Sequence, residues 1–214
     1  ELRAARAAQA EWTAGLAQPA TPMHALFVQN TLRSILRPDD CIVFDGGDFC
    51  HFGRSLIPAL KPKHWLYVSS LGMIGTSLPS ALAAKIAYPD SRVFMLTGDG
   101  AFGFNGMEFD TAVRHKLNIV ALLGNDSAWG IDRQIQLGLY GRPVATDLLQ
   151  TRYDQMVQGL GGYGEFVDRP EDLAPALERA LAAKRPALLN VAVARAISPR
   201  AEAAIGRRKA AAQK

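Results

Sequence analysis

Cysteine, long apolar runs and clustered aromatic residues are all scarce in this sequence, and each shortage excludes a class of protein. Two cysteines in 214 residues, Cys41 and Cys50, cannot make a disulfide framework or a metal cluster by themselves, so we expect a cytoplasmic protein. The longest apolar runs, such as 119–123, fall far short of the ~18 residues that a membrane-spanning helix needs, so we expect no membrane partner.

The positive net charge is not arranged as in a nucleic-acid-binding protein. The net charge is +4, but lysine and arginine do not gather with aromatic side chains, so we expect no nucleic-acid partner. The one concentrated basic stretch, Arg207-Arg208-Lys209 with Lys214, lies among alanines near the C-terminus. We interpret it as a solvated tail or, alternatively, as a grip on a phosphorylated substrate.

Short apolar runs alternate with helical stretches along most of the chain, which is typical of a parallel sheet covered on both faces. We therefore predict an α/β fold, a three-layer sandwich with a central, mostly parallel sheet of about six strands and helices on both faces. The predicted strands are 41–45, 66–69, 92–97, 118–124, 164–167 and 187–194. The predicted helices are 1–17, 22–37 with Thr21 as its cap and Pro22 at its first position, 51–59, 78–88, 106–115, 153–160 and 170–183.

The third predicted strand runs into Gly98-Asp99-Gly100-Ala101-Phe102-Gly103, which matches the G-x-G-x-x-G pattern of dinucleotide-binding proteins. Asp126 even follows the next strand, where a ribose-binding carboxylate would be expected. However, the bare carboxylate of Asp99 would repel a pyrophosphate held by the same loop. A Mg²⁺ ion between the two anions removes this conflict, because it prefers oxygen ligands of both kinds.

The loop after the next strand, Gly124-Asn125-Asp126-Ser127-Ala128-Trp129-Gly130, offers more oxygen donors than ribose recognition uses. Asp126 can supply a side-chain oxygen and Ala128 a backbone carbonyl on the same edge of the sheet. We therefore favour a metal and diphosphate site over an NAD-binding Rossmann oxidoreductase, which stays the remote alternative. Trp129, Arg133 and Gln134 either border the substrate or belong to a packed helix.

A Gly-Asp-Gly that ends a strand, followed 27 residues after its aspartate by an N-[ND]-x-x-[WYF]-G loop, resembles the signature of thiamine-diphosphate-dependent enzymes. The resemblance implies that Asp99 and Asp126 are side-chain ligands of Mg²⁺ and Ala128 a main-chain ligand. It also implies that Gly98, Gly100 and Ala101 belong to the loop that binds the diphosphate. The chain departs from the family in having Asp126 where Asn is common, which keeps an oxygen donor but adds a negative charge.

Two upstream segments match the same family. In Ser70-Leu71-Gly72-Met73-Ile74-Gly75, the resemblance implies that the Gly72 carbonyl accepts a hydrogen bond from the aminopyrimidine and that Ile74 holds the two cofactor rings in a V shape. Asp45-Gly46-Gly47-Asp48-Phe49 is similar to the loop that touches the diphosphate, with Asp48 and Phe49 at the contacting positions. An Asp-Gly-Gly turn after a strand is also common for purely structural reasons.

The resemblance runs from about Thr21 to Ala194 and is closest to the branch with acetolactate synthase, benzaldehyde lyase, oxalyl-CoA decarboxylase and 2-hydroxyacyl-CoA lyase. It implies a lead-in helix and linker at 1–20, a thiamine-diphosphate-binding domain at 21–196 and a basic tail at 197–214. The family's activating glutamate lies on a pyrimidine-binding domain of the same or a partner chain, so we expect no catalytic residue in this chain. Because the family's active sites form between subunits, the resemblance also implies a homodimer or homotetramer.

The implied activity is a thiamine-diphosphate- and Mg²⁺-dependent lyase or carboligase of carbon–carbon bonds, with 2-hydroxyacyl-CoA lyase favoured. The implied substrate is a small 2-hydroxyacyl compound or 2-oxo acid, with a CoA thioester as the favoured class. An acetolactate-synthase-like carboligase and a 2-oxo acid decarboxylase stay open, as does a non-catalytic binding module.

Overall fold

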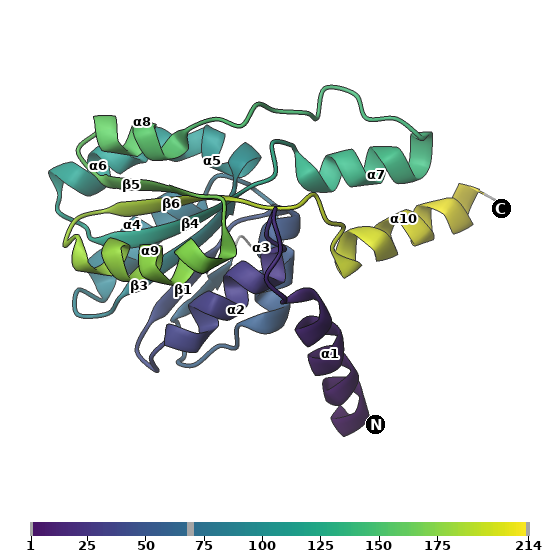
Figure 1. Cartoon of the computed structure of the whole chain (residues 1–214), viewed down its shortest axis with the longest axis horizontal. Coiled ribbons are helices and arrows are strands. Elements are labelled where there is room, and N and C mark those ends of the chain that lie inside the picture. The colour runs from purple at the N-terminus through teal and green to yellow at the C-terminus, as the bar shows by residue number, and fades with distance from the viewer. Residues whose placement is uncertain (1, 68–70, 213–214) are drawn as a thin grey trace.

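Six parallel strands form one sheet in the computed structural model of the protein, which describes residues 2–67 and 71–212 (Figure 1). The order across the sheet is β2-β1-β3-β4-β6-β5. The strands are β1 (Cys41–Phe44), β2 (Trp65–Tyr67), β3 (Val93–Gly98), β4 (Ile119–Asn125), β5 (Tyr163–Val167) and β6 (Ala187–Ala192). The predicted α/β fold with a central parallel sheet is confirmed.

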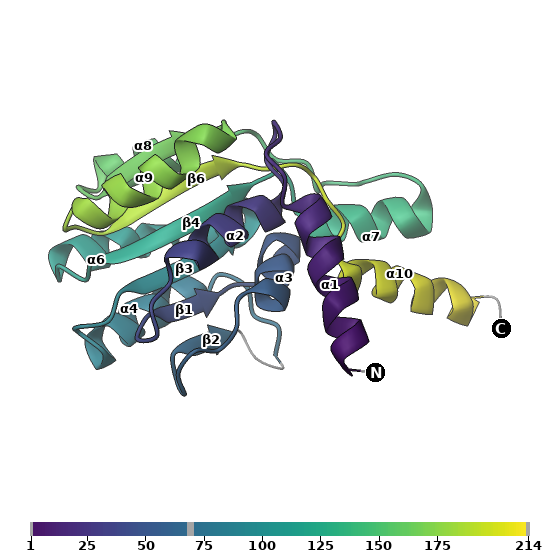
Figure 2. The same cartoon turned by 60° about the horizontal axis from the view of Figure 1, so that its bottom comes forward.

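Alternate side chains of the central strands enter two separate cores, because successive residues of a strand point to opposite faces. In β3, Phe94 and Leu96 pack under one helical layer, while Val93 and Met95 pack under the other. The first layer contains α2 (Ala25–Ile35), α3 (Gly47–Leu56) and α9 (Pro170–Ala182). The second contains α4 (Ser77–Ala87), α5 (Asp99–Asn105), α6 (Phe109–Arg114) and α8 (Tyr153–Gly159), with a 3₁₀ turn at Gly106–Glu108 (Figure 2).

The strand order contains a point where the chain reverses its direction across the sheet. From β1 the chain moves outward to the edge strand β2, and it then returns to the other side of β1 as β3. The loops that leave the carboxyl ends of β1 and β3 therefore diverge and leave a crevice between them. Ligands of open α/β sheets bind at such switch points.

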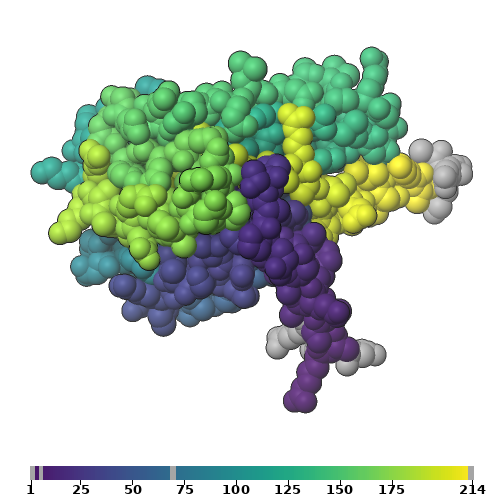
Figure 3. Space-filling view, viewed as in Figure 1, coloured from purple at the N-terminus to yellow at the C-terminus, as the bar shows by residue number. Residues whose placement is uncertain are grey.

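Three helices extend away from the sandwich: α1 (Leu2–Leu16), α7 (Gly130–Tyr140) and α10 (Pro199–Ala212) (Figures 1 and 3). None of the eleven described residues of α7 is buried. α10 packs on α7 through Ala201 and Ile205, which are 1% and 8% exposed, and Gly138 of α7 faces Ile205. The basic residues Arg207, Arg208 and Lys209 are exposed, as in a solvated tail, although the start of this segment is a helix that packs on α7.

Several predicted boundaries also needed correction. α2 begins at Ala25 rather than at Pro22, because His24 is its cap and Met23 instead pairs with Val193 beyond β6. α3 begins at Gly47, and α5 begins at Asp99, inside the glycine motif that we expected to be a loop. The predicted end of the second strand, 68–69, lies outside the described residues. Among the helices described, none is both long and apolar enough to cross a membrane.

Candidate functional site

A pocket opens at the carboxyl edge of the sheet, where the loops after β1, β3, β4 and β6 meet. Nine of the ten residues predicted to bind the cofactor line it. They are Asp48, Phe49, Ile74, Gly98, Asp99, Gly100, Ala101, Asp126 and Ala128. The tenth, Gly72, is not among the lining residues and has a left-handed backbone, with φ of +64°. The structure thus brings together four segments that are far apart in the sequence.

Two acidic side chains, Asp99 and Asp126, lie side by side in this pocket. Asp99 is the first residue of α5 and is 2% exposed, while Asp126 follows β4 and is half-buried. Burial raises the pKa of Asp99 above its ordinary value, although backbone hydrogen bonds and a hydrogen bond with the Asp126 side chain oppose this. Burial also raises the pKa of Asp126, and the negative charge of Asp99 raises it further. The charge of Asp99 therefore makes the ionised form of Asp126 less favourable, whereas a hydrogen bond between the two side chains favours the ionised form of Asp99.

The carboxyl group of Asp99 is held in a fixed orientation by the backbone. One of its oxygens accepts a hydrogen bond from the Gly100 N–H at 3.0 Å, and the other accepts from the Ala128 N–H at 3.2 Å. The second bond joins the loop after β3 to the loop after β4. In the described parts of the chain, no lysine or arginine forms a salt bridge with Asp99 or Asp126.

This donor set fits Mg²⁺. Two adjacent carboxylates with no salt-bridged cation have an unfavourable charge that a divalent cation would neutralise, and Mg²⁺ prefers oxygen ligands. The pocket also has room beside the second carboxylate only because residue 130 is glycine: a Cβ there would lie 2.7 Å from an Asp126 oxygen. The residues present could therefore hold a magnesium ion between Asp99 and Asp126.

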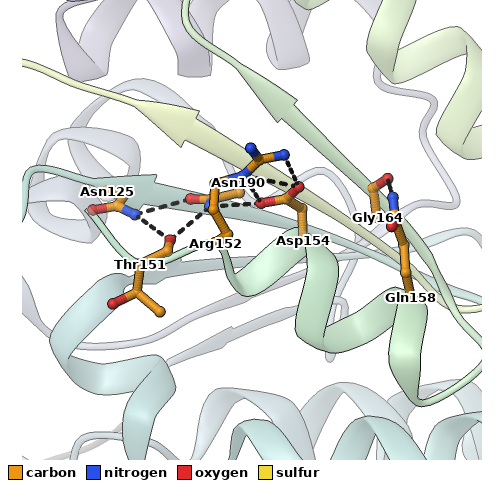
Figure 4. A network of polar contacts seen from close by, with 7 residues as sticks. All are labelled: Asn125, Thr151, Arg152, Asp154, Gln158, Gly164 and Asn190. Atoms are coloured by element: carbon orange, nitrogen blue, oxygen red, sulfur yellow. Dashed lines mark hydrogen bonds and ion pairs between the residues drawn. The ribbon is translucent and has the colours of Figure 1, made fainter. Parts of the chain in front are cut away.

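The loop that carries Asp126 is supported from below by buried amides. Asn125, which is 1% exposed, accepts a hydrogen bond from the Ser127 N–H at 3.2 Å and donates to the Asn190 side chain at 3.1 Å. Asn190 in turn donates to Asp154 and to the Thr151 carbonyl, both at 3.0 Å (Figure 4). These bonds connect β4, β6 and the start of α8. They fix the point at which the main chain leaves the sheet toward Asp126.

The loop after β1 is held by a carboxylate whose role the sequence did not reveal. Asp45 is fully buried, and one of its oxygens accepts hydrogen bonds from the N–H groups of Gly46 and Gly75, at 2.7 and 2.9 Å. Its other oxygen accepts from the Ser77 hydroxyl at 2.5 Å. Asp45 therefore anchors the segment that contains Ile74. A polar residue at the end of a buried strand is the signal that could have identified it.

Ile74 and Gly46 are closely packed in this anchored segment. A Cβ on Gly46 would lie 2.7 Å from the Cγ2 atom of Ile74, so the absence of a side chain at 46 lets Ile74 approach the end of β1. Ile74 is half-buried and lines the pocket. Its place in the pocket thus depends on the Asp-Gly turn at 45–46.

Asp48 and Phe49 lie in the first turn of α3 and are each 7% exposed. Burial raises the pKa of Asp48, and hydrogen bonds with Ser198 lower it less than burial raises it. One Asp48 oxygen accepts from the Ser198 N–H at 3.2 Å, while the other has no hydrogen-bond partner among the described residues. Burial thus makes the ionised form of Asp48 less favourable than it is in water.

The sequence allows two interpretations of Trp129, Arg133 and Gln134, as residues that border the substrate or as part of a packed helix. Trp129 lines the pocket, and its ring packs so close to Gly100 that a Cβ there would lie 2.9 Å away. Arg133 belongs to α7 and pairs with Asp147 at 2.8 Å, outside the lining residues. Gln134 also lies on α7 and does not line the pocket. Asp132, which we did not single out, does line it.

The comparisons with known proteins agree with this geometry. The family described as thiamine pyrophosphate enzyme, C-terminal TPP binding domain, matches residues 45–191. A probable acetolactate synthase of Mycobacterium bovis is 44% identical over 171 residues, which cover 79% of this chain and 31% of that protein. A 2-hydroxyacyl-CoA lyase 2 of Homo sapiens is 39% identical over 159 residues, which cover 73% of this chain and 24% of that protein.

Two solved structures share the fold. One is a thiamine diphosphate-dependent 4-hydroxybenzoylformate decarboxylase of Rhodococcus jostii RHA1, with a TM-score of 0.73 and 24% identity, covering 82% of this chain and 33% of that one. The other is a benzoylformate decarboxylase of Polynucleobacter necessarius, with a TM-score of 0.77 and 19% identity, covering 84% of this chain and 35% of that one. The chain spans about a third or less of the length of the relatives that it matches. With 147 residues matched by the family and the pocket formed at its glycine motif, the chain belongs to the thiamine pyrophosphate enzymes and comprises their C-terminal TPP binding domain.

Proposed function

We propose that this chain supplies the diphosphate- and metal-binding domain of a thiamine-diphosphate- and Mg²⁺-dependent enzyme that makes or breaks a carbon–carbon bond. The observation that carries the proposal is the adjacent pair of Asp99, which is buried, and Asp126, which is half-buried, at the ends of neighbouring strands in a domain of this family. An NAD-binding Rossmann protein has no use for a second carboxylate facing the first. A structural pair would be expected to have a lysine or arginine partner.

In this proposal the side chains of Asp99 and Asp126 and the carbonyl of Ala128 hold the metal ion. The backbone of Gly98, Gly100 and Ala101 approaches the diphosphate, and Asp48 and Phe49 contact it from α3. Ile74 supports the two cofactor rings, and Gly72 accepts a hydrogen bond from the pyrimidine. The buried Asp48 oxygen that has no hydrogen-bond partner among the described residues supports its part, because it remains available to a ligand.

When bound, thiamine diphosphate supplies the electron sink for the bond that is cleaved or formed. This chain positions it and neutralises its charge. We further propose that 1–20 is a lead-in helix and linker, that 21–196 is the cofactor-binding domain and that 197–214 is a basic C-terminal segment. A pyrimidine-binding domain of the same or a partner chain would provide the activating glutamate, so the working unit would be at least a dimer.

Two substrate classes are in contention. The resemblance to 2-hydroxyacyl-CoA lyases, which are 33–40% identical over 147–176 residues, favours a 2-hydroxyacyl-CoA thioester. The 44% identity with the mycobacterial acetolactate synthases favours carboligation of a 2-oxo acid such as pyruvate. Both reactions need the same cofactor site, so the distinction lies in the surroundings of the reacting carbon.

The test uses the full-length protein that contains this chain. It is stripped of cofactor with EDTA and then given thiamine diphosphate with Mg²⁺, either component alone, or NAD. We expect binding, measured by calorimetry, only for thiamine diphosphate with a divalent cation; NAD binding in its place would contradict the proposal. The reconstituted protein is then incubated with a 2-hydroxyacyl-CoA or with pyruvate. Aldehyde and formyl-CoA would identify the lyase, whereas acetolactate would identify the carboligase.

A further inference from the structure

Arg195 connects the segment after β6 to the loop that carries Asp126. Its Nε donates a hydrogen bond to the Asp126 carbonyl at 2.9 Å, and its Nη2 donates to the Ser127 carbonyl at 2.8 Å. Its Nη1 lies 3.0 Å from an Asp147 oxygen. One guanidinium group therefore contacts two consecutive main-chain carbonyls of this loop and a carboxylate beyond it.

The loop needs such support because of its backbone conformation. Ser127 has φ of 55°, in the left-handed region that a serine seldom adopts, and a side chain must compensate for this cost. Asn125, at the end of β4, accepts a hydrogen bond from the Ser127 N–H. Arg195, in the segment after β6, donates hydrogen bonds to the carbonyls of Asp126 and Ser127. The main chain on both sides of the Asp126 side chain is thereby fixed.

Asp147 extends the support to Ala128. It pairs with Ala128 in an antiparallel bridge, forms an ion pair with Arg195 and accepts a hydrogen bond from Arg133. The Arg195–Asp147 ion pair is partly exposed, with 36% and 54% of the side chains accessible, so on its own it would contribute little. The hydrogen bonds from Arg195 to the two carbonyl oxygens contribute more, because charged donors make stronger hydrogen bonds and the planar guanidinium fixes their geometry.

We infer that Arg195 is a positioning residue of the metal site: it sets the main chain of 126–128 so that the Asp126 carboxylate faces Asp99. The inference rests on the proposed function, since it concerns how that site is preorganised. Groups that orient a metal ligand typically contribute about 10–100-fold to metal affinity. Arg195 forms no salt bridge with either carboxylate, but its positive charge does act on Asp126 at longer range. Arg195→Lys keeps that charge and so separates it from the hydrogen bonds to the backbone.

The experiment measures the Mg²⁺ concentration for half-maximal binding of thiamine diphosphate to the full-length protein, by calorimetry. The variants are Arg195→Ala, Arg195→Lys and Asp147→Asn. The matched control is Arg179→Ala, which removes an arginine of similar exposure that pairs with Glu165 on the edge strand β5. The unfolding temperature in EDTA is measured for each variant, because a merely structural role would lower that temperature without changing the Mg²⁺ requirement.

We expect Arg195→Ala to raise the Mg²⁺ requirement at least about tenfold. Arg195→Lys should raise it about threefold, because an ammonium group cannot reach both carbonyls and Asp147 together. Asp147→Asn should have a smaller effect, and Arg179→Ala none. An unchanged Mg²⁺ requirement in Arg195→Ala would overturn the inference. A wild-type Mg²⁺ requirement in Arg195→Lys would show that the shape of the guanidinium group is not needed. If the alanine variant does not fold, the lysine variant decides. If the wild-type protein binds no thiamine diphosphate with Mg²⁺, the proposed function fails as well.

Discussion

Two groups of buried carboxylates lie at the same edge of the sheet, and they differ in how their charge is balanced. Asp154, 1% exposed, accepts hydrogen bonds from Arg152 at 2.6 Å and from Asn190 at 3.0 Å (Figure 4). Burial acts to raise the pKa of Asp154, but these hydrogen bonds outweigh it, and the net shift is downward. Asp99 and Asp126 face each other without such partners, and the pKa of each is raised.

The difference separates a carboxylate that serves the fold from a pair that serves a ligand. The Asp154 network is complete as it stands, so its removal should cost stability. The Asp99–Asp126 pair is incomplete, so it should cost stability until a cation binds. Perturbed pKa values of this kind gather at functional sites because function requires charge that the fold leaves unbalanced.

The largest expected effect is that of Asp99→Ala in the full-length protein. Loss of one metal ligand should weaken Mg²⁺-dependent binding of thiamine diphosphate by at least roughly 100-fold, about 2.7 kcal/mol. The unfolding temperature in EDTA should change little, because the variant removes the repulsion from Asp126 but also the acceptor of the Gly100 and Ala128 N–H groups. Calorimetric titration checks the first part and thermal unfolding the second. Wild-type affinity in this variant would mean that the carboxylate is not a ligand.

The opposite result is expected for Asp154→Ala. It leaves the Asn190 amide and the Arg152 guanidinium without their partner and should lower the free energy of unfolding by about 2 kcal/mol. Urea denaturation in EDTA measures this loss. The Mg²⁺ requirement should change far less than in Asp99→Ala, and a larger change in metal binding than in stability would erase the distinction between the two groups.

Asp126→Asn should sharpen the comparison. The substitution keeps an oxygen donor but removes one charge, so Mg²⁺ affinity should fall by roughly tenfold. The metal-free variant should be more stable than wild type at neutral pH, because the raised pKa of Asp126 means that folding disfavours its charged form. This advantage should shrink as the pH falls and the wild-type pair takes up a proton. The measurement is thermal unfolding of both proteins in EDTA across a range of pH. A difference in unfolding temperature that does not change with pH would mean that the charge of Asp126 is already compensated in the metal-free protein.

The smallest effect is expected for Gly46→Ala. The added Cβ would meet the Cγ2 atom of Ile74 at 2.7 Å, which is closer than real contacts allow, so the Ile74 side chain must shift. Affinity for thiamine diphosphate should fall by about threefold while the Mg²⁺ requirement stays the same, on the order of 0.6 kcal/mol. The double variant with Ile74→Val should recover part of the loss. A shift in the Mg²⁺ requirement would place the defect at the metal instead.

The sequence predicted the sheet and the pairing of Asp99 with Asp126 because both depend on short-range patterns. Apolar runs mark the strands, and parallel strands bring their carboxyl ends to one edge. Arg195 and Asp45 could not be found in this way. Arg195 acts on a loop 68–69 residues away, and the anchor at Asp45 depends on hydrogen bonds across 30–32 residues. A helix at α7 was only one of two interpretations, because α7 buries no residue fully and its apolar side chains mark no core.

The most direct test is a crystal structure of the full-length protein grown with thiamine diphosphate and Mn²⁺, which gives an anomalous signal. We predict one anomalous peak between the carboxylates of Asp99 and Asp126, ligated by both and by the cofactor's diphosphate. A bound cofactor with the manganese elsewhere, or with either carboxylate turned away from it, would contradict the account.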